Sequence, residues 1–165
     1  MSDRPNWDKT FIDILHVISK RSCCIKYNIS SILVRGQQIL AMGYNGTLPG
    51  KKECYNYWRE WYQANQLGSM EWFPEWTQTD EFKKLHSEWS KLNELHAEAN
   101  VLASISKDNI QPGDTLYTMY APCETCAKSI VYHGIKTVKY LNDYSRDDGI
   151  KILKNNGVTV IKLLG

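Results

Sequence analysis

Hydrophobic and polar positions recur along this chain with two periods, which predict where its helices and strands lie. Near the start, apolar residues with the i, i+3, i+4, i+7 spacing of an amphipathic helix occur at Phe11, Ile14, Leu15 and Ile18. Apolar stretches at 29–34 and 39–42 are separated by a short polar turn that contains Gly36. We therefore expect a helix followed by an antiparallel hairpin.

After a long intervening region, strands and helices alternate. The pattern predicts helices over 97–105, 123–132 and 147–156, and strands over 115–119, 137–141 and 158–163. Gly134 and Gly157 follow two of these helices, as is typical of helix ends. The resulting order, α-β-β-α-β-α-β-α-β, predicts an α/β fold in which helices cover a mixed sheet of five strands.

Composition narrows the class of protein. A chain of 165 residues with 42% hydrophobic and 23% charged residues fits one globular domain over 1–165. The formal net charge of +2 offers no large basic field for nucleic acid. The first residues, Met1 to Pro5, lack the apolar core of a signal peptide, and no apolar run approaches the length of a membrane span. We expect a cytoplasmic protein whose five cysteines are reduced.

Two short motifs contain the candidate metal ligands and the candidate catalytic residue. They are His96-x-Glu98 and the cysteine pair Cys123-x-x-Cys126, which directly follows Pro122. One imidazole and two thiolates suit Zn²⁺ and leave a coordination position for water, beside which Glu98 can transfer protons. A structural zinc site would normally add a fourth Cys or His nearby, and a redox pair would lack the upstream His-x-Glu. Both motifs fall at predicted helix starts, where the helix dipole favours thiolates.

Together with the loop Gly43-Tyr44-Asn45-Gly46, these motifs resemble the cytidine deaminase-like superfamily and, within it, the deoxycytidylate (dCMP) deaminases, especially the phage-type members. The resemblance extends over residues 7–162. It implies a three-layer fold and the hydrolysis of dCMP to dUMP and ammonia, which supplies dUMP for thymidylate synthesis. It also implies that water attacks C4 of cytosine, that Glu98 protonates N3 and the departing amine, and that the Ala97 N–H helps to hold the base.

Substrate contacts are open to two interpretations each. The resemblance implies that Asn45 contacts the sugar, although an Asn-Gly pair is also a turn signal in its own right. Arg21 and Lys26 are candidate phosphate partners, or ordinary solvated residues. Tyr120 either stacks on the base or fills the core.

The resemblance also implies a second, structural zinc, since phage-type members hold one with residues that correspond to Cys24, His86 and Glu94 here. Such an ion would attach the long intervening region to the first helix. Taken singly, these residues read as a buried thiol, a helix-surface imidazole and a solvated carboxylate. A mixed site needs at least one further ligand, which the sequence does not identify. Cys23 and Cys54 are then unassigned thiols.

Residues 51–91 form the least interpretable region, which we expect to be an insertion. It contains five of the six tryptophans, among acidic residues. The aromatic rings could stack on single-stranded nucleic acid, but the acidic residues would repel phosphates, so rings packed inward or against another subunit are favoured. From the resemblance we expect a homo-oligomer, with a hexamer as one form, and a nucleoside triphosphate effector.

Other functions compete with dCMP deamination. The enzyme could also accept dCTP, or it could deaminate a polynucleotide, either adenosine in tRNA or cytosine in single-stranded DNA. A third alternative is a zinc-stabilised regulator without catalysis.

Overall fold

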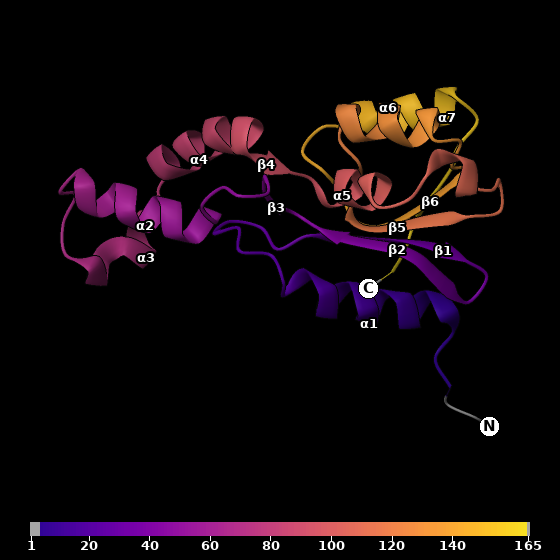
Figure 1. The fold of residues 1–165 in the computed structure, drawn as a ribbon, viewed down its shortest axis with the longest axis horizontal. Helices are drawn as coiled ribbons and strands as arrows, with labels where there is room; N and C mark the ends of the chain where they lie inside the picture. The colour runs from indigo at the N-terminus through magenta and orange to yellow at the C-terminus, as the bar shows by residue number, and fades with distance from the viewer. Residues whose placement is uncertain (1–3, 165) are drawn as a thin grey trace.

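Five strands form the central mixed sheet of the computed structural model, which describes residues 4–164 (Figure 1). In spatial order they are β2 (Gln38–Tyr44), β1 (Ser30–Arg35), β5 (Thr115–Tyr120), β6 (Thr137–Asn142) and β7 (Thr159–Lys162). β1 pairs antiparallel with both of its neighbours, whereas β5, β6 and β7 run parallel to one another. The predicted five-stranded mixed sheet is therefore confirmed.

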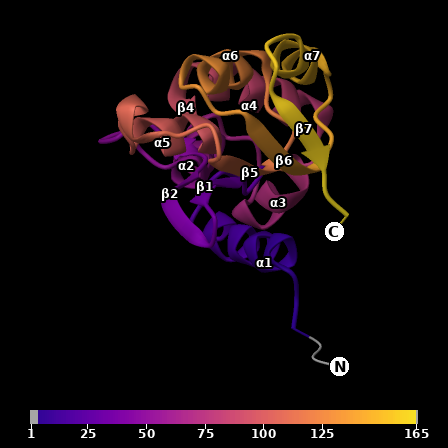
Figure 2. The same cartoon turned by 90° about the vertical axis from the view of Figure 1, so that its right-hand side faces the viewer.

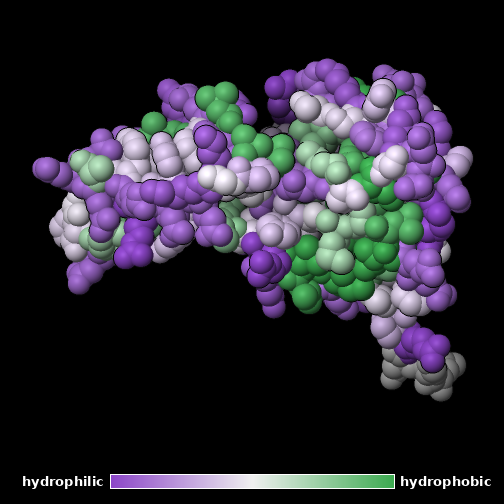
Figure 3. All heavy atoms as spheres, in the orientation of Figure 1, coloured by the Kyte–Doolittle hydropathy of each residue, from purple (hydrophilic) through white to green (hydrophobic). Residues whose placement is uncertain are grey.

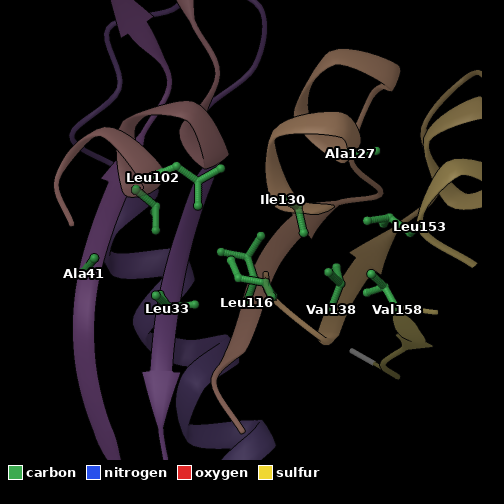
Figure 4. Close-up of a cluster of buried hydrophobic side chains, with 11 residues drawn as sticks. Leu33, Ala41, Leu102, Leu116, Ala127, Ile130, Val138, Leu153 and Val158 are labelled. Carbon is green, nitrogen blue, oxygen red and sulfur yellow. The ribbon is translucent and has the colours of Figure 1, made fainter. Parts of the chain in front are cut away.

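Helices cover both faces of this sheet (Figures 1 and 2). α1 (Trp7–Ser19) packs on one face, and the other carries α5 (Ala97–Ala103), α6 (Glu124–Tyr132) and α7 (Asp148–Asn155). Alternation along β1 explains the two cores, because Ile32 and Val34 pack with α1 while Leu33 faces the opposite layer. Figure 4 shows this second core, in which Leu33, Leu116 and Val138 are completely buried.

The predicted element boundaries agree with the structure to within a few residues. The first helix begins at Trp7, four residues before the first apolar position of its stripe, and α5 ends at Ala103. Gly134 and Gly157 have φ angles of 81° and 72°, as their places after α6 and α7 predict. Residues 1–3 and 165 lie outside the described residues. They belong to the predicted domain, and residues 1–3 also belong to the stretch in which we expect no signal peptide.

A helical segment extends from one end of the sheet (Figure 1). It consists of α2 (Cys54–Ala64), the short turns η1 (Met70–Trp72) and α3 (Phe73–Trp76), and α4 (Asp80–Asn93). The short strands β3 (Gly46–Thr47) and β4 (Glu94–Leu95) pair where it joins the sheet, and a turn of 3₁₀ helix, η2 (Lys107–Asn109), follows α5. We call α2 to α4 the outer helical segment.

Aromatic rings form the core of the outer helical segment. Trp58, Tyr62, Phe73 and Phe82 are at most 3% exposed, and Trp58 packs edge-on against Phe82 with 5.2 Å between ring centroids. These four rings face inward, as we expected. That the segment is an insertion into a single domain stays a prediction. Within residues 4–164, no helix combines the length and apolar character needed to cross a membrane.

Candidate active site

The starts of two helices bring the predicted metal ligands together. His96 immediately precedes α5, Cys123 immediately precedes α6, and Cys126 lies in the first turn of α6. His96 Nδ1 is 3.4 Å from Cys123 Sγ and 3.5 Å from Cys126 Sγ. Nitrogen and sulfur ligands of a tetrahedral zinc ion are about 3.6 Å apart, so the donor set fits Zn²⁺ in chemistry and in spacing.

One of these three groups, the Cys123 thiol, loses its proton easily, whereas the other two hold theirs. A hydrogen bond from the Cys126 thiol and the neighbouring His96 lower the pKa of Cys123 to about 4. The Cys123 thiolate in turn raises the pKa of Cys126, and it raises the pKa of His96 to about 9. A thiolate held beside a second thiol is the state from which a metal ion displaces the remaining protons.

Glu98 lies in the first turn of α5, with its carboxylate buried beside the ligands. Its side chain is 5% exposed, and Oε2 is 3.8 Å from Cys126 Sγ. The Thr118 hydroxyl donates to Oε1 over a long 3.4 Å, and the Ser31 hydroxyl donates to Thr118 over 2.8 Å. Burial raises the pKa of Glu98. A carboxyl group with a raised pKa can both accept and return a proton near neutral pH.

A second group of metal-ligating side chains lies where the outer helical segment joins the sheet. Cys24 Sγ is 3.5 Å from His86 Nε2, and Cys54 Sγ is 3.3 Å from the same nitrogen. Glu94 Oε2 is 3.8 Å from Cys24 Sγ. The other Glu94 oxygen is buried without a hydrogen-bond partner, which a metal ion would supply. These four side chains, Cys24, Cys54, His86 and Glu94, are the outer metal cluster.

Cys54 is the ligand that sequence reasoning left unassigned. It is 1% exposed, and it lies on the same face of α2 as Trp58 and Tyr62, the other two buried residues of this helix. That i, i+4, i+8 spacing was the available signal, since it places Cys54 on the buried side. Cys23, by contrast, is exposed.

The two groups of ligands open into one cavity of about 310 Å³. Among the predicted substrate contacts, Lys26, Asn45, Ala97 and Tyr120 line this cavity, whereas Arg21 is not among its lining residues. Sequence reasoning missed the contribution of α4, which supplies Ser87, Ser90 and Lys91 to the wall.

Asn45 has a structural task as well as a place at the cavity. Its side chain accepts from the Ile29 N–H over 2.8 Å and donates to the Tyr27 carbonyl over 2.9 Å. One amide N–H and one lone pair remain for a ligand. The Tyr27 and Tyr120 rings meet edge-on with centroids 6.1 Å apart, and Tyr120 is partly exposed in the cavity. The geometry thus accommodates both interpretations of each residue.

Comparisons with known proteins agree with this site. The family model described as the cytidine and deoxycytidylate deaminase zinc-binding region matches residues 5–142. The deoxycytidylate deaminase of Saccharomyces cerevisiae is 34% identical over 158 residues, which are 95% of this chain and 45% of the yeast protein. That of Enterobacteria phage T4 is 30% identical over a 176-residue alignment that covers 93% of this chain and 88% of the phage protein. This chain therefore spans less than half of the yeast relative but most of the phage one.

A solved structure extends the likeness to the whole fold. The dCMP deaminase from cyanophage S-TIM5, in complex with dCMP and dUMP, superposes with a TM-score of 0.68 and 27% identity. The superposition covers 98% of this chain and all of the cyanophage chain.

Proposed function

We propose, from the premise that this chain belongs to the deoxycytidylate deaminase family, that it hydrolyses dCMP to dUMP with release of ammonia. One observation carries the proposal: the buried Glu98 carboxylate lies beside the His96, Cys123 and Cys126 ligand group at the wall of a single cavity. A proton carrier next to three zinc ligands is the apparatus of hydrolytic deamination.

The side chains that would hold the catalytic zinc are His96, Cys123 and Cys126. When bound, zinc supplies a Lewis acid that makes water nucleophilic at neutral pH. The outer metal cluster has four protein ligands and leaves no open position, which suits a structural zinc.

The residues around the cavity transfer the protons and bind the substrate. Glu98 accepts one proton from the attacking water and delivers it to N3 of cytosine; it then takes the second proton from the hydroxyl now on C4 and delivers it to the amine, which leaves as ammonia. Thr118 fixes one oxygen of this carboxylate, so the other stays aimed toward the ligands. The Ala97 N–H and the free amide atoms of Asn45 hold the base and the sugar, and Tyr120 flanks the base. Arg21 can take part only at the outer end of the substrate, since it does not line the cavity.

The proposal extends to the setting of the enzyme. We place it in the cytoplasm, where it supplies dUMP for thymidylate synthesis, as a single domain with an insertion at 51–91 and under control of a nucleoside triphosphate. Self-assembly is supported by apolar side chains that gather over the β1–β2 side of the molecule (Figure 3). Met42, on the edge strand β2, is 57% exposed. An edge strand with exposed apolar residues favours pairing with another copy.

Ammonia release from zinc-loaded protein tests the proposal, with dCMP, dCTP, deoxycytidine and cytidine-containing oligonucleotides offered in parallel. We expect turnover of dCMP, and we expect Glu98→Gln to lower kcat by about 10²–10⁴-fold, since it removes a general acid and base. Zinc content should stay unchanged, because Glu98 is not among the ligands. Turnover of oligonucleotides alone, or none with zinc bound, would contradict the proposal.

A further inference from the structure

α4 presents two different faces. Phe82, Leu85, His86 and Trp89 face the aromatic core of the outer helical segment. Ser87, Ser90 and Lys91, with Glu94 just beyond the helix, follow the i, i+3, i+4, i+7 spacing and line the cavity, which His86 also reaches. The outer helical segment is thus one wall of the substrate cavity.

The polar side chains of this stripe differ in whether they already have a hydrogen-bond partner. The Ser90 hydroxyl donates to Glu94 Oε2 over 2.6 Å and is therefore occupied by a member of the outer metal cluster. Among residues 4–164, the side chains of Ser87 and Lys91 have no such hydrogen bond. Glu94 itself is committed to the outer metal cluster by its contact with Cys24. Ser87 and Lys91 therefore remain for a ligand.

Charge identifies that ligand. Lys26 and Lys91 supply all the lysine and arginine side chains among the described residues of the cavity wall. Across residues 4–164, neither has a carboxylate within ion-pair distance. Among the described residues of the same wall, the carboxylates are Glu94 and Glu98, and both lie beside the two ligand groups. Two uncompensated ammonium groups at a cavity wall favour a dianion.

We propose that Lys91 and Ser87 of α4, together with Lys26, bind the substrate phosphate, so that α4 makes the enzyme selective for a nucleoside monophosphate. This inference rests on the proposed function. A phosphomonoester carries a charge of about −1.5 to −2 at pH 7, which two lysines neutralise. The further charge of a triphosphate would face no additional lysine or arginine in the described wall. The aromatic core then has a function, since it holds in place the helix whose side chains bind the phosphate.

Calorimetric binding of dUMP and of deoxyuridine to zinc-loaded protein tests this inference without relying on turnover. We expect Lys91→Met, which keeps most of the aliphatic stem, to lower the preference for dUMP over deoxyuridine by about tenfold or more, because a charge-assisted hydrogen bond is lost. Lys84→Met is the matched control, since Lys84 is exposed on the same helix and does not line the cavity. In addition, dUTP should bind more weakly than dUMP.

Several results would overturn the inference: equal preferences in Lys91→Met and Lys84→Met, no preference for dUMP in the unchanged protein, or tighter binding of dUTP than of dUMP. If Lys91→Met loses zinc or unfolds, Ser87→Ala replaces it, with a smaller loss expected in the same preference. Ammonia release by the unchanged protein is measured separately. A protein that deaminates dCMP but shows no effect of Lys91 refutes only this inference, whereas one that binds dUMP through Lys91 without turnover refutes only the proposed function.

Discussion

Asp114 shows how a single residue can fix the geometry of the sheet. Its carboxylate is completely buried just before β5, and it accepts from Arg35 Nε over 2.7 Å and from Arg35 Nη2 over 2.9 Å. The Gln111 N–H donates to the same group over 2.8 Å. Arg35 therefore lowers the pKa of Asp114. This ion pair joins the ends of two adjacent strands, β1 and β5.

Asp114→Asn should lower the free energy of unfolding by about 1–3 kcal/mol at pH 7, since it removes the negative charge that accepts three hydrogen bonds. The pKa of this group is lower in the folded than in the unfolded protein, so its stabilisation is present above the unfolded value, about 3.9, and is lost as the pH falls through the folded value. The stability difference between the two proteins should therefore shrink below about pH 4. Urea unfolding of both proteins at pH 7 and pH 3 measures it. A constant difference would contradict this account.

Residues whose chemistry is encoded locally could be predicted from the sequence. His96 and Glu98 are two residues apart, and Cys123 and Cys126 are three apart, so spacing alone identifies them. Cys54 could not be assigned, because its partner His86 is 32 residues away and only the packing of α2 on α4 joins them. Arg35 and Asp114 are 79 residues apart and escaped notice for the same reason.

Close contact between α7 and the loop before α6 positions Cys123. Gly149 is buried in the first turn of α7, and a Cβ atom there would lie 1.9 Å from the carbonyl oxygen of Pro122. Pro122 directly precedes the ligand Cys123. Only a residue without a side chain allows α7 to approach this closely, so the packing of two helices holds a metal ligand in place.

Gly149→Ala should displace the Pro122–Cys123 backbone and weaken zinc binding by about tenfold, because forcing a methyl group into a packed contact costs about 1–3 kcal/mol. Chelator competition measures the zinc affinity. Gly113→Ala is the control, since a Cβ atom at Gly113 meets nothing within 4 Å. Equal zinc affinities in the two variants would refute the positioning role of Gly149.

Elements with a clear period were predictable, and those without one were not. The parallel strands and their helices follow simple apolar spacing, and they were placed correctly. The outer helical segment was anticipated only as a compact aromatic region, since its rings are too dense for one stripe to stand out. Its helices are defined by ring-to-ring packing such as the stacked Trp61 and Trp76, whose planes lie at 15°.

On the scale of the whole molecule, the outer metal cluster is the joint between the outer helical segment and the central sheet. Its ligands come from the loop after α1, the start of α2, the middle of α4 and β4. Chain segments up to 70 residues apart meet there, as for Cys24 and Glu94. An ion bound by all four would fix α4, and with it one wall of the substrate cavity, relative to the sheet.

Cys54→Ala should lower the zinc content from about two ions to about one per chain, because a structural zinc site requires four protein ligands. Tryptophan fluorescence should shift to longer wavelength, since Trp58 lies one turn from Cys54 and would become exposed. Cys23→Ala is the control, because Cys23 is exposed and lies outside both ligand groups. Metal analysis and fluorescence decide the matter, and unchanged zinc content in Cys54→Ala would rule out this joint.

His96 and Cys123 occupy the N-cap positions of α5 and α6, yet neither side chain accepts a hydrogen bond from its helix. Ser, Thr, Asp or Asn at such a position typically stabilises a helix by about 1 kcal/mol. Both helices lack that stabilisation at the ends that face the cavity, so without an ion these ends are the places where fraying should start. An ion bound by His96 and Cys123 would link the starts of the two helices to each other. Metal binding and the ordering of these helix ends are therefore coupled.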